Sequence, residues 1–364
     1  MRVDHRAVPG HAGRGSRRVH CGVVELSDLD YDLPRAAIAQ APPETREAAR
    51  LLVIDRAGGA LDDRRVSDLP QLLRAGDCLV VNDSRVIPAR VLAEDARGRA
   101  VELLFVDGET SGRWRALVRP GSRCRPGAQL SIGAARLDVL GVTDDGARVV
   151  ERRDGTIEDL LASHGLPPLP PYIARHAKPA PEDWERYQTV YARSPGSVAA
   201  PTAGLHFSDA LLARLRERGV EVHAVTLHVG PATFRPLTTP SVETHTLPPE
   251  RATVSAATAA AVTAARREGR RVVAVGTTVT RTLESAAGED GHVAPLDGHA
   301  TATIRPGHHF RAVDALLTNF HLPRSSLLVL VSAFAGRELI LGAYRHAVAA
   351  GYRFYSYGDA TLIQ

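Results

Sequence analysis

Several histidines of this chain stand at the ends of short apolar runs, or in loops beside them. His206 lies among small residues in a loop, His228 falls near the end of an apolar run, His245 lies in a turn and His321 follows a third run. Because an imidazole titrates near neutral pH, such residues suit roles as acid, base or hydrogen-bond donor. An isolated loop histidine is also commonly structural, so both interpretations stay open.

The segment 272–281 passes from an apolar run into a helical pattern. It places Thr277 and Thr278 at a predicted helix N-terminus, where unpaired N–H groups attract negative charge. A carboxylate or a phosphate group would fit there. The plainer alternative is that one threonine caps the helix and that Arg281 pairs with Glu284.

Several kinds of site are disfavoured by what the chain lacks. The three cysteines are far apart, and neither they nor the histidines have the spacing of a local zinc motif, so we expect no metal. No Gly-x-Gly-x-x-Gly follows a strand, and neither a Walker loop nor a Gly-x-Ser-x-Gly elbow occurs. Dinucleotide, nucleoside-triphosphatase and serine-hydrolase chemistry are therefore disfavoured.

The net charge of +4 is confined to the first 24 residues. Five of the 45 basic and one of the 41 acidic side chains lie there, which leaves 40 of each in the rest of the chain. Any RNA contact must therefore come from a local patch. Because no run of about 18 uncharged apolar residues and no secretory signal occurs, we expect a soluble, cytoplasmic protein with no membrane contact. We also expect a monomer.

Helical patterns alternate with short, fully apolar strands over most of the chain. This alternation predicts an α/β fold with a mostly parallel sheet flanked by helices. Such sheets bind ligands at the carboxyl ends of their strands, where many of the candidate residues stand. The expected strands cover residues 51–54, 78–81, 220–229, 272–275, 315–317 and 352–355, and the expected helices cover residues 208–216, 255–267, 325–335 and 338–349.

Residues from about 90 to 160 show a different pattern, with short strands separated by Gly, Asp and Pro turns. This pattern is typical of an all-β barrel or sandwich, so we predict an inserted barrel-like domain. The strand candidates are 101–106, 113–118, 129–132, 136–142 and 147–152.

These patterns predict three parts of the chain. Residues 1–24 are rich in Gly, Arg and His and are expected to form a flexible basic tail, which could also touch RNA. Residues 25–88 and 166–364 are expected to form the α/β catalytic domain, with residues 89–165 as the inserted domain.

Motif-like segments occur along nearly the whole chain. They include Val81-Asn-Asp-Ser-Arg-Val-Ile-Pro-Ala-Arg90, Tyr187-Gln-Thr-Val-Tyr191, Val198-Ala-Ala-Pro-Thr-Ala-Gly-Leu-His-Phe207, Thr318-Asn-Phe-His-Leu-Pro323 and Ser356-Tyr-Gly-Asp359. From about residue 29 to residue 364, these segments resemble in order and spacing the motifs of the S-adenosylmethionine:tRNA ribosyltransferase-isomerase family.

The resemblance implies a reaction. The ribosyl moiety of S-adenosylmethionine is transferred to 7-aminomethyl-7-deazaguanine at the tRNA wobble position and isomerised, which gives epoxyqueuosine-tRNA and releases adenine and methionine. The sulfonium acidifies the adjacent 5′ carbon, so a base can remove a proton there, and the aminomethyl group must be neutral to attack. S-adenosylmethionine is a co-substrate, and no other cofactor is implied.

Motif membership also implies roles for individual residues. His206 and His321 are expected to transfer protons, with Thr202 and Asp359 positioning the reacting groups. The expected substrate-binding residues are Thr277, Thr278, Arg281, His228, Asn319 and Gly204.

A third set of residues is expected to contact RNA or the acceptor base. The forked guanidinium of arginine can bind a phosphate through two hydrogen bonds, and tyrosine can stack on a base. Each member could equally form an ion pair or pack in the interior. The set comprises Arg85, Arg90, Arg119, Arg175 and Tyr187.

Four positions depart from the family pattern. Ser122 stands where a lysine is expected, Ala232 where a glycine is expected, Pro248 near an expected histidine and Thr361 where a methionine is expected. Because two of these changes remove a charge or a donor, two alternatives stay open. One is a divergent paralogue with a non-tRNA acceptor, and the other is a catalytically inactive protein that binds tRNA in a salt-dependent manner.

Overall fold

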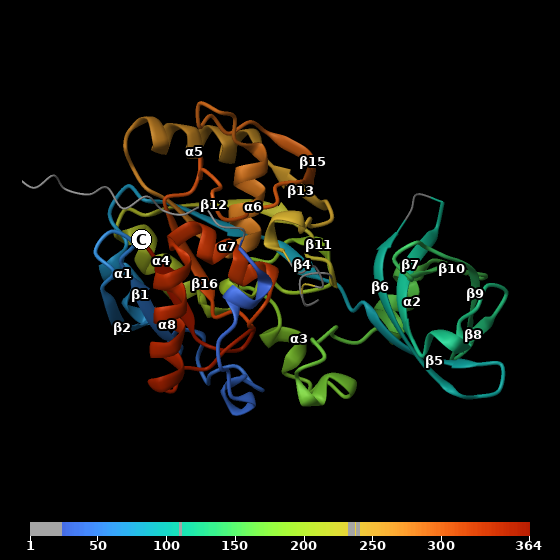
Figure 1. Ribbon diagram of the computed structural model, residues 1–364. Helices are drawn as coiled ribbons and strands as arrows, with labels where there is room; N and C mark the ends of the chain where they lie inside the picture. The colour runs from blue at the N-terminus through green and yellow to red at the C-terminus, as the bar shows by residue number, and fades with distance from the viewer. Residues whose placement is uncertain (1–23, 109–110, 232–236, 238–240) are drawn as a thin grey trace, which may run out of the picture.

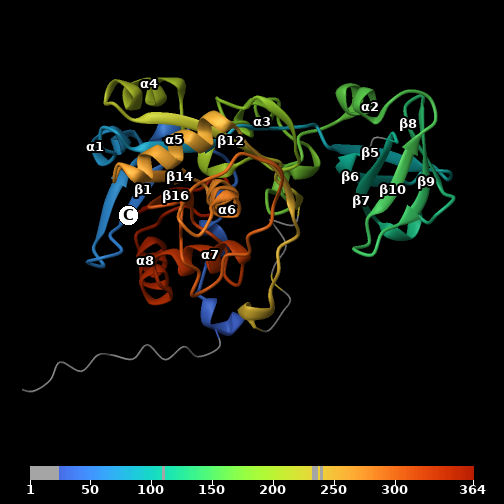
Figure 2. The same cartoon turned by 90° about the horizontal axis from the view of Figure 1, so that it is seen from above.

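The structure is a computed structural model that describes residues 24–108, 111–231, 237 and 241–364. It consists of an α/β body and a small barrel at one side of it (Figures 1 and 2). Two segments join them, one after β4 (Ser84–Val86) and one between α2 (Ile157–His164) and α3 (Asp183–Arg186) (Figure 1). The expected tail lies outside the described residues, apart from Val24.

The body is built on a nine-stranded sheet in the order β15-β13-β12-β3-β14-β16-β17-β1-β2. Its centre is parallel and consists of β12 (Glu221–Leu227), β3 (Cys78–Asn82), β14 (Val272–Val275) and β16 (Ala315–Asn319). Antiparallel pairs are made by β15 (Leu296–Ala300) with β13 (Glu250–Val254), β13 with β12, β16 with β17 (Ala360–Ile363), and β1 (Arg50–Ile54) with β2 (Leu61–Arg65).

The sheet is therefore mixed. The α/β class is confirmed, whereas the expectation of a mostly parallel sheet needs correction, because β2, β13, β15 and β17 had not been predicted as strands. The strand expected at 352–355 is also wrong. Tyr355 has a positive φ of 77°, and Phe354 forms only an isolated bridge with Ile38, so the final strand begins at Ala360.

The central strands are buried on both faces. Cys78 and Val80 enter one hydrophobic core, while Leu79 and Val81 enter the other. Such two-sided burial explains why these strands are continuous apolar runs rather than alternating ones. The first core is covered by α5 (Ala256–Arg267), α6 (Thr277–Ala286), α7 (Ser326–Ala335) and α8 (Arg337–Ala349), and the second by α1 (Leu69–Leu72) and α4 (Asp209–Glu217) (Figure 2).

Two predicted helix starts are confirmed by their caps. Ser208 and Ser255 accept hydrogen bonds from the backbone N–H groups of Leu211 and Thr258, which would otherwise lack a partner in the first turn. Among the described residues, no single helix is long and apolar enough to cross a membrane. Only the bent pair of α7 and α8 reaches that length and composition together.

The barrel is closed and antiparallel, in the order β10-β7-β6-β5-β8-β9. Alternate side chains such as Val91, Leu103 and Phe105 fill its interior, and α2 packs against β5. The inserted all-β architecture is thus confirmed, while the domain boundaries at residues 89 and 165 remain a prediction. The strands are β5 (Arg90–Asp95), β6 (Ala100–Gly108), β7 (Arg113–Arg119), β8 (Gln129–Ile132), β9 (Ala135–Val142) and β10 (Arg148–Arg152).

Candidate active site

A small polar pocket lies at the carboxyl ends of the parallel strands. Because β12, β3, β14 and β16 run in the same direction, the residues that follow them meet at one edge of the sheet. We call this cavity of about 40 Å³ the strand-end pocket. Its lining includes five of the predicted site residues, Thr202, Thr277, Thr278, Asn319 and His321, together with Tyr355 and Ser356.

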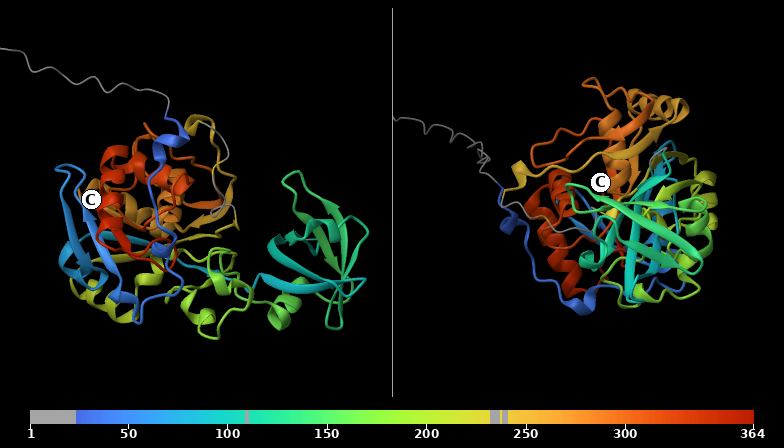
Figure 3. Two further views of the ribbon diagram at one scale, coloured as in Figure 1. Left: turned by 60° about the horizontal axis from the view of Figure 1, so that its bottom comes forward. Right: turned by 90° about the vertical axis from the view of Figure 1, so that its right-hand side faces the viewer.

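The strand-end pocket leads toward a much larger cleft between the body and the barrel. A cavity of about 30 Å³, the Arg281 pocket, shares Thr277 and Thr278 with it. The Arg281 pocket in turn shares Pro248 and Glu250 with a cleft of about 910 Å³. The cleft is lined by residues of the barrel and of the body. These two parts of the molecule stand apart from each other in the left view of Figure 3. A large ligand in the cleft therefore lies beside the buried polar pocket.

Asn319 connects His206 to the strand-end pocket. Its Nδ2 atom donates to the Tyr355 carbonyl at 3.1 Å and lies 3.1 Å from His206 Nε2. Because the carbonyl can only accept, this nitrogen must be the amide donor, so His206 Nε2 accepts and its Nδ1 carries the hydrogen. Asn319 Oδ1 is buried and has no hydrogen-bond partner among the described residues. Because Asn319 lines the pocket, this oxygen is a candidate acceptor for a donor group of a ligand.

Both histidines of the site are held neutral. Burial, with smaller contributions from Arg353 and Arg46, lowers the pKa of His206 to about 4. Burial alone lowers the pKa of His321 to about 3. The charged form of each imidazole would lose its hydration without gaining a partner, so the neutral form is favoured at pH 7.

His321 is fixed by its backbone and by its ring. Its N–H donates to the Tyr344 hydroxyl at 3.2 Å, and the Tyr31 hydroxyl donates to its carbonyl. Its Nε2 atom lies 3.2 Å from Thr318 Oγ1. This anchoring presents the ring to the strand-end pocket, which His321 lines.

The start of α6 forms one wall of the same pocket. The helix is capped by Gly276, at φ 96°, and no side chain makes the cap hydrogen bond. The alternative in which Thr277 or Thr278 caps the helix is therefore wrong. Instead, Thr278 Oγ1 accepts from buried Asn82 at 3.3 Å. An anionic group in the pocket would meet the positive end of the helix dipole.

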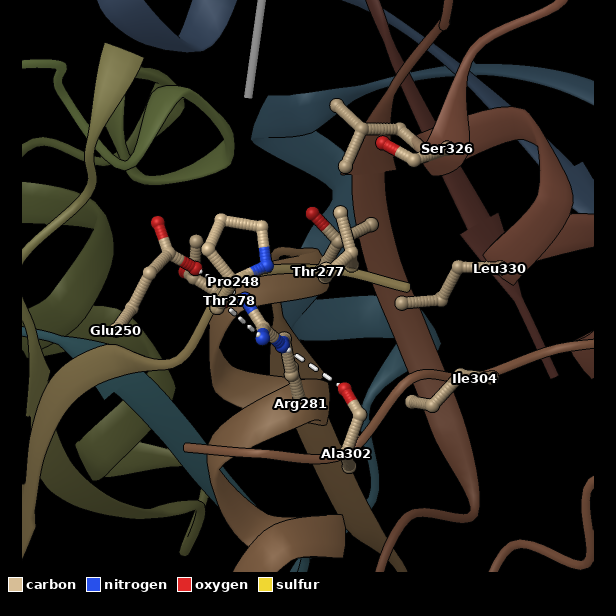
Figure 4. A pocket seen from close by; sticks show the side chains of 11 residues that line it. Pro248, Glu250, Thr277, Thr278, Arg281, Ala302, Ile304, Ser326 and Leu330 are labelled. Carbon is tan, nitrogen blue, oxygen red and sulfur yellow. Dashed lines mark hydrogen bonds and ion pairs between the residues drawn. The ribbon is translucent and has the colours of Figure 1, made fainter. Parts of the chain in front are cut away.

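Arg281 forms a buried ion pair with Glu250, so its guanidinium is not free to bind a substrate anion. Its guanidinium donates to Glu250 and to the carbonyls of Ala302 at 2.9 Å and Pro248 at 2.7 Å, so each of its three nitrogens has a protein acceptor (Figure 4). The expected alternative partner, Glu284, instead accepts from the backbone N–H groups of residues 311–313 and lies 3.2 Å from His308. Burial raises the pKa of Glu250, and Arg281 partly offsets that rise.

Besides His206 and Arg281, three more predicted residues lie outside the strand-end pocket. A Cβ at Gly204 would meet the Tyr191 hydroxyl at 2.1 Å, so packing requires this glycine, not the approach of a substrate. Asp359 accepts from the backbone N–H groups of Arg50 and Arg353 at 2.9 and 2.8 Å, which ties the final loop to β1. His228 lines the cleft, and its Nδ1 atom is buried with no partner among the described residues.

The residues expected to contact RNA divide into two groups. Arg85 and Arg119 are exposed. Arg175 is paired with buried Asp183, at 2.9 and 2.6 Å, and Arg90 is buried and paired with Glu102 at 3.0 Å. Tyr187 is 1% exposed and contacts the ring of Tyr357 edge-on, so it packs in the interior and presents no face to a base.

The positions that depart from the family pattern are scattered. Thr361 is buried in β17 and donates to the Thr318 carbonyl at 3.2 Å, and the Pro248 carbonyl accepts from Arg281. Ser122 lies in a short turn of the barrel between β7 and β8. Ala232 lies outside the described residues. Two of the four thus take part in hydrogen bonds that support the pocket.

Sequence reasoning missed three residues of the site. Glu250 lines both the cleft and the Arg281 pocket, Asn82 bridges β3 to Thr278, and Tyr355 lines the strand-end pocket in a strained backbone conformation. Asn82 stood in a motif and could have been assigned from its place at the carboxyl end of β3. No group of three or more His, Cys, Asp or Glu side chains within the described ranges is arranged to hold a metal ion.

Fold and site together define a protein class: an α/β protein with an inserted antiparallel barrel and a buried polar pocket that leads into the cleft between them. The chain belongs to the family of queuosine biosynthesis proteins, whose family model matches residues 26–363. The resemblance inferred from the motifs is thereby confirmed.

Relatives and a solved structure agree with this assignment. The S-adenosylmethionine:tRNA ribosyltransferase-isomerases of Symbiobacterium thermophilum and Moorella thermoacetica are 52% and 51% identical to the chain, over 93% of it and 100% of their own length. A crystal structure of S-adenosylmethionine tRNA ribosyltransferase from Thermotoga maritima is 35% identical, covers 93% of this chain and 100% of its own, and has a TM-score of 0.53.

Proposed function

We propose that this chain transfers and isomerises the ribosyl moiety of S-adenosylmethionine onto 7-aminomethyl-7-deazaguanine in tRNA. The main supporting observation is convergence. Thr202, Thr277, Thr278, Asn319 and His321 come from three separate motif segments and line one pocket beside a cleft of about 910 Å³. The names of the relatives in the same family support this choice of reaction.

In this proposal the strand-end pocket receives the reacting part of S-adenosylmethionine. The α6 N-terminus, with Thr277 and Thr278, suits the methionine carboxylate because it lacks a side-chain cap. The free Oδ1 atom of Asn319 accepts a hydrogen bond from a substrate N–H or O–H group. Each contact would hold the co-substrate in a fixed orientation before the acceptor attacks.

His321 and His206 would have different roles. His321 lines the pocket as a neutral imidazole, so it can donate a hydrogen bond to the departing adenine without bringing a positive charge toward the sulfonium. His206 does not line the pocket and acts through Asn319, so we assign it as a positioning residue. This revises the expectation that both histidines transfer protons.

The cleft would receive the tRNA. Arg85 and Arg119 do not line the cleft, but both are exposed and are available for phosphate contacts near the barrel. S-adenosylmethionine enters as co-substrate, and tRNA modification would place the protein in the cytoplasm. A monomeric state remains a prediction.

The test is a single incubation with S-adenosylmethionine and tRNA that carries 7-aminomethyl-7-deazaguanine, in which adenine release and nucleoside mass are followed together. We expect equimolar adenine and epoxyqueuosine. Adenine without modified tRNA would indicate a different acceptor. Binding of both ligands without either product would contradict the enzymatic proposal.

A further inference from the structure

A second cavity lies beside the cleft, outside the strand-end pocket. It has a volume of about 320 Å³ and lies between the outer face of the barrel and the connector that follows α2. It shares Leu117 and Pro231 with the cleft, so the two cavities adjoin. We call it the proline-walled pocket, because Pro168, Pro170, Pro171 and Pro231 contribute to its lining.

One wall of the proline-walled pocket carries a buried donor with an unused hydrogen-bonding atom. The side chain of Arg90 is 3% exposed, and its Nε atom donates to Glu102. Its Nη1 atom is buried and has no partner among the described residues. A buried donor without an acceptor costs about 1–3 kcal/mol, so an acceptor supplied by a ligand would be favoured at this point.

The same wall also offers an acceptor and a second cation. Arg90 lies opposite Leu104, and Glu102 lies opposite Arg119, on the outward face of β5, β6 and β7. The Glu102 side chain is 32% exposed, so its carboxylate can also accept from a ligand. Exposed Arg119 lines the pocket as well and suits a phosphate.

These features match an unpaired nucleotide. A nucleobase has apolar faces and an edge with both donors and acceptors, and proteins recognise single-stranded RNA by enclosing such splayed bases. The apolar proline and leucine side chains would contact the faces, while Arg90 and Glu102 would meet the edge. The volume lies within the range of pockets that enclose small ligands.

We propose that the proline-walled pocket binds the base of a tRNA nucleotide adjacent to the one that is modified. This inference rests on the proposed function, which places the modified nucleotide in the adjoining cleft. The pocket would read or anchor a neighbouring nucleotide and so help to select the tRNA, and it takes no part in the chemical step.

The test compares two leucine-to-tryptophan variants on the same face of the barrel. Leu104 lines the pocket, so Leu104→Trp fills it. Leu92 lies on the neighbouring strand, is 52% exposed and does not line the pocket, so Leu92→Trp is the matched control. The ligands are anticodon stem-loops with the modified base, either intact or lacking the base on its 5′ or 3′ side. Kd is measured by fluorescence anisotropy.

We expect one of the two abasic loops to bind the native protein about tenfold more weakly than the intact loop, since contacts to a single unstacked base are worth about 1–3 kcal/mol. Leu104→Trp should bind the intact loop about tenfold more weakly and should no longer distinguish it from that abasic loop. Leu92→Trp should behave as the native protein does. Non-additivity of this kind identifies a direct contact.

Undiminished discrimination by Leu104→Trp would overturn the proposal, as would equal weakening by both tryptophan variants. Thermal unfolding of each variant identifies any loss of affinity that arises from unfolding, and Arg90→Met then provides an independent removal of the donor. Adenine release by the native protein separates the two proposals. If the native protein releases adenine but binds intact and abasic loops equally, only the proposal for the proline-walled pocket is overturned. If it distinguishes the loops but releases no adenine, only the proposed enzymatic function is overturned.

Discussion

The buried residues around the strand-end pocket and the exposed arginines near the barrel use polar side chains in opposite ways. In the body, His206, His321 and Asn319 are 3, 4 and 2% exposed, and burial keeps both imidazoles neutral. On the barrel and near its connection to the body, Arg119 and Arg85 are exposed to solvent. Buried, preoriented groups suit transition-state stabilisation, while exposed charges give salt-dependent affinity for nucleic acid.

This contrast indicates a division of labour. Changes to the buried pocket should reduce kcat or stability and leave tRNA affinity alone. Changes to the exposed arginines should alter tRNA affinity and its salt dependence, with kcat unchanged at saturation. Each of the following experiments tests this division.

The largest expected effect is on turnover. His321→Gln replaces the fixed, neutral imidazole of the strand-end pocket and should lower kcat by about 100-fold, because the loss of one donor positioned for the transition state costs about 10²–10³-fold. The Kd for tRNA should stay within about twofold. Single-turnover adenine release and anisotropy measure the two quantities. His346→Gln, at a half-exposed position on α8, is the control. Weaker tRNA binding with normal turnover would reverse the assignment.

Breaking the Arg281–Glu250 pair should destabilise the body. Arg281→Met leaves the Glu250 carboxylate buried without its cation and should lower the free energy of unfolding by about 3–5 kcal/mol. The double variant Arg281→Met/Glu250→Gln should recover part of that loss, since no buried charge is left unpaired. Urea unfolding measures both. A double variant no more stable than the single one would mean that the lost hydrogen bonds of Arg281, rather than the isolated charge, dominate.

The buried histidines predict a pH-dependent stability. Their folded pKa values, about 4 and 3, lie below the ordinary value of 6.5, so the unfolded chain binds more protons between these limits. Their contribution is complete above pH 6.5 and is lost as the pH falls toward the folded values. For each histidine, the free energy of unfolding should fall by about 2 kcal/mol between pH 8 and pH 5. In His206→Gln, the change in the free energy of unfolding between pH 8 and pH 5, measured with urea, should be smaller by about that amount. An unchanged pH dependence would contradict the prediction.

Local patterns predicted many of the elements but missed the strands β2, β13, β15 and β17. The run at 272–275 is β14 itself, because four buried apolar residues before a glycine can hardly form another element here. Neither β17 nor its direction could be predicted in the same way. It pairs antiparallel with β16 and parallel with β1, and this choice depends on partners about 45 and 310 residues away along the chain.

For the site too, local position in the sequence was predictive, whereas contacts with residues far along the chain were not. Strand-end position brought Thr277, Asn319 and His321 together, because parallel neighbours share an edge. The state of Arg281 depended on Glu250, which comes 31 residues earlier, and Tyr187 proved to be buried against Tyr357. Burial and ion pairing are set by tertiary contacts, so motif membership alone could not separate a ligand-binding arginine from a structural one.

The smallest expected effect concerns Arg119, which is exposed and lines the proline-walled pocket beside the cleft. Arg119→Ala should weaken tRNA binding a few-fold and reduce the slope of log Kd against log salt by about one, because one phosphate contact releases about one counterion. The value of kcat at saturating tRNA should not change. Arg97, exposed in the turn between β5 and β6, provides the matched control Arg97→Ala. If both variants weaken binding equally, the tRNA responds to the overall charge of the barrel and not to Arg119. A normal salt dependence of Kd combined with a lower kcat would mean that Arg119 contributes to the chemical step. That result would contradict the division between a buried catalytic pocket and exposed tRNA-binding arginines.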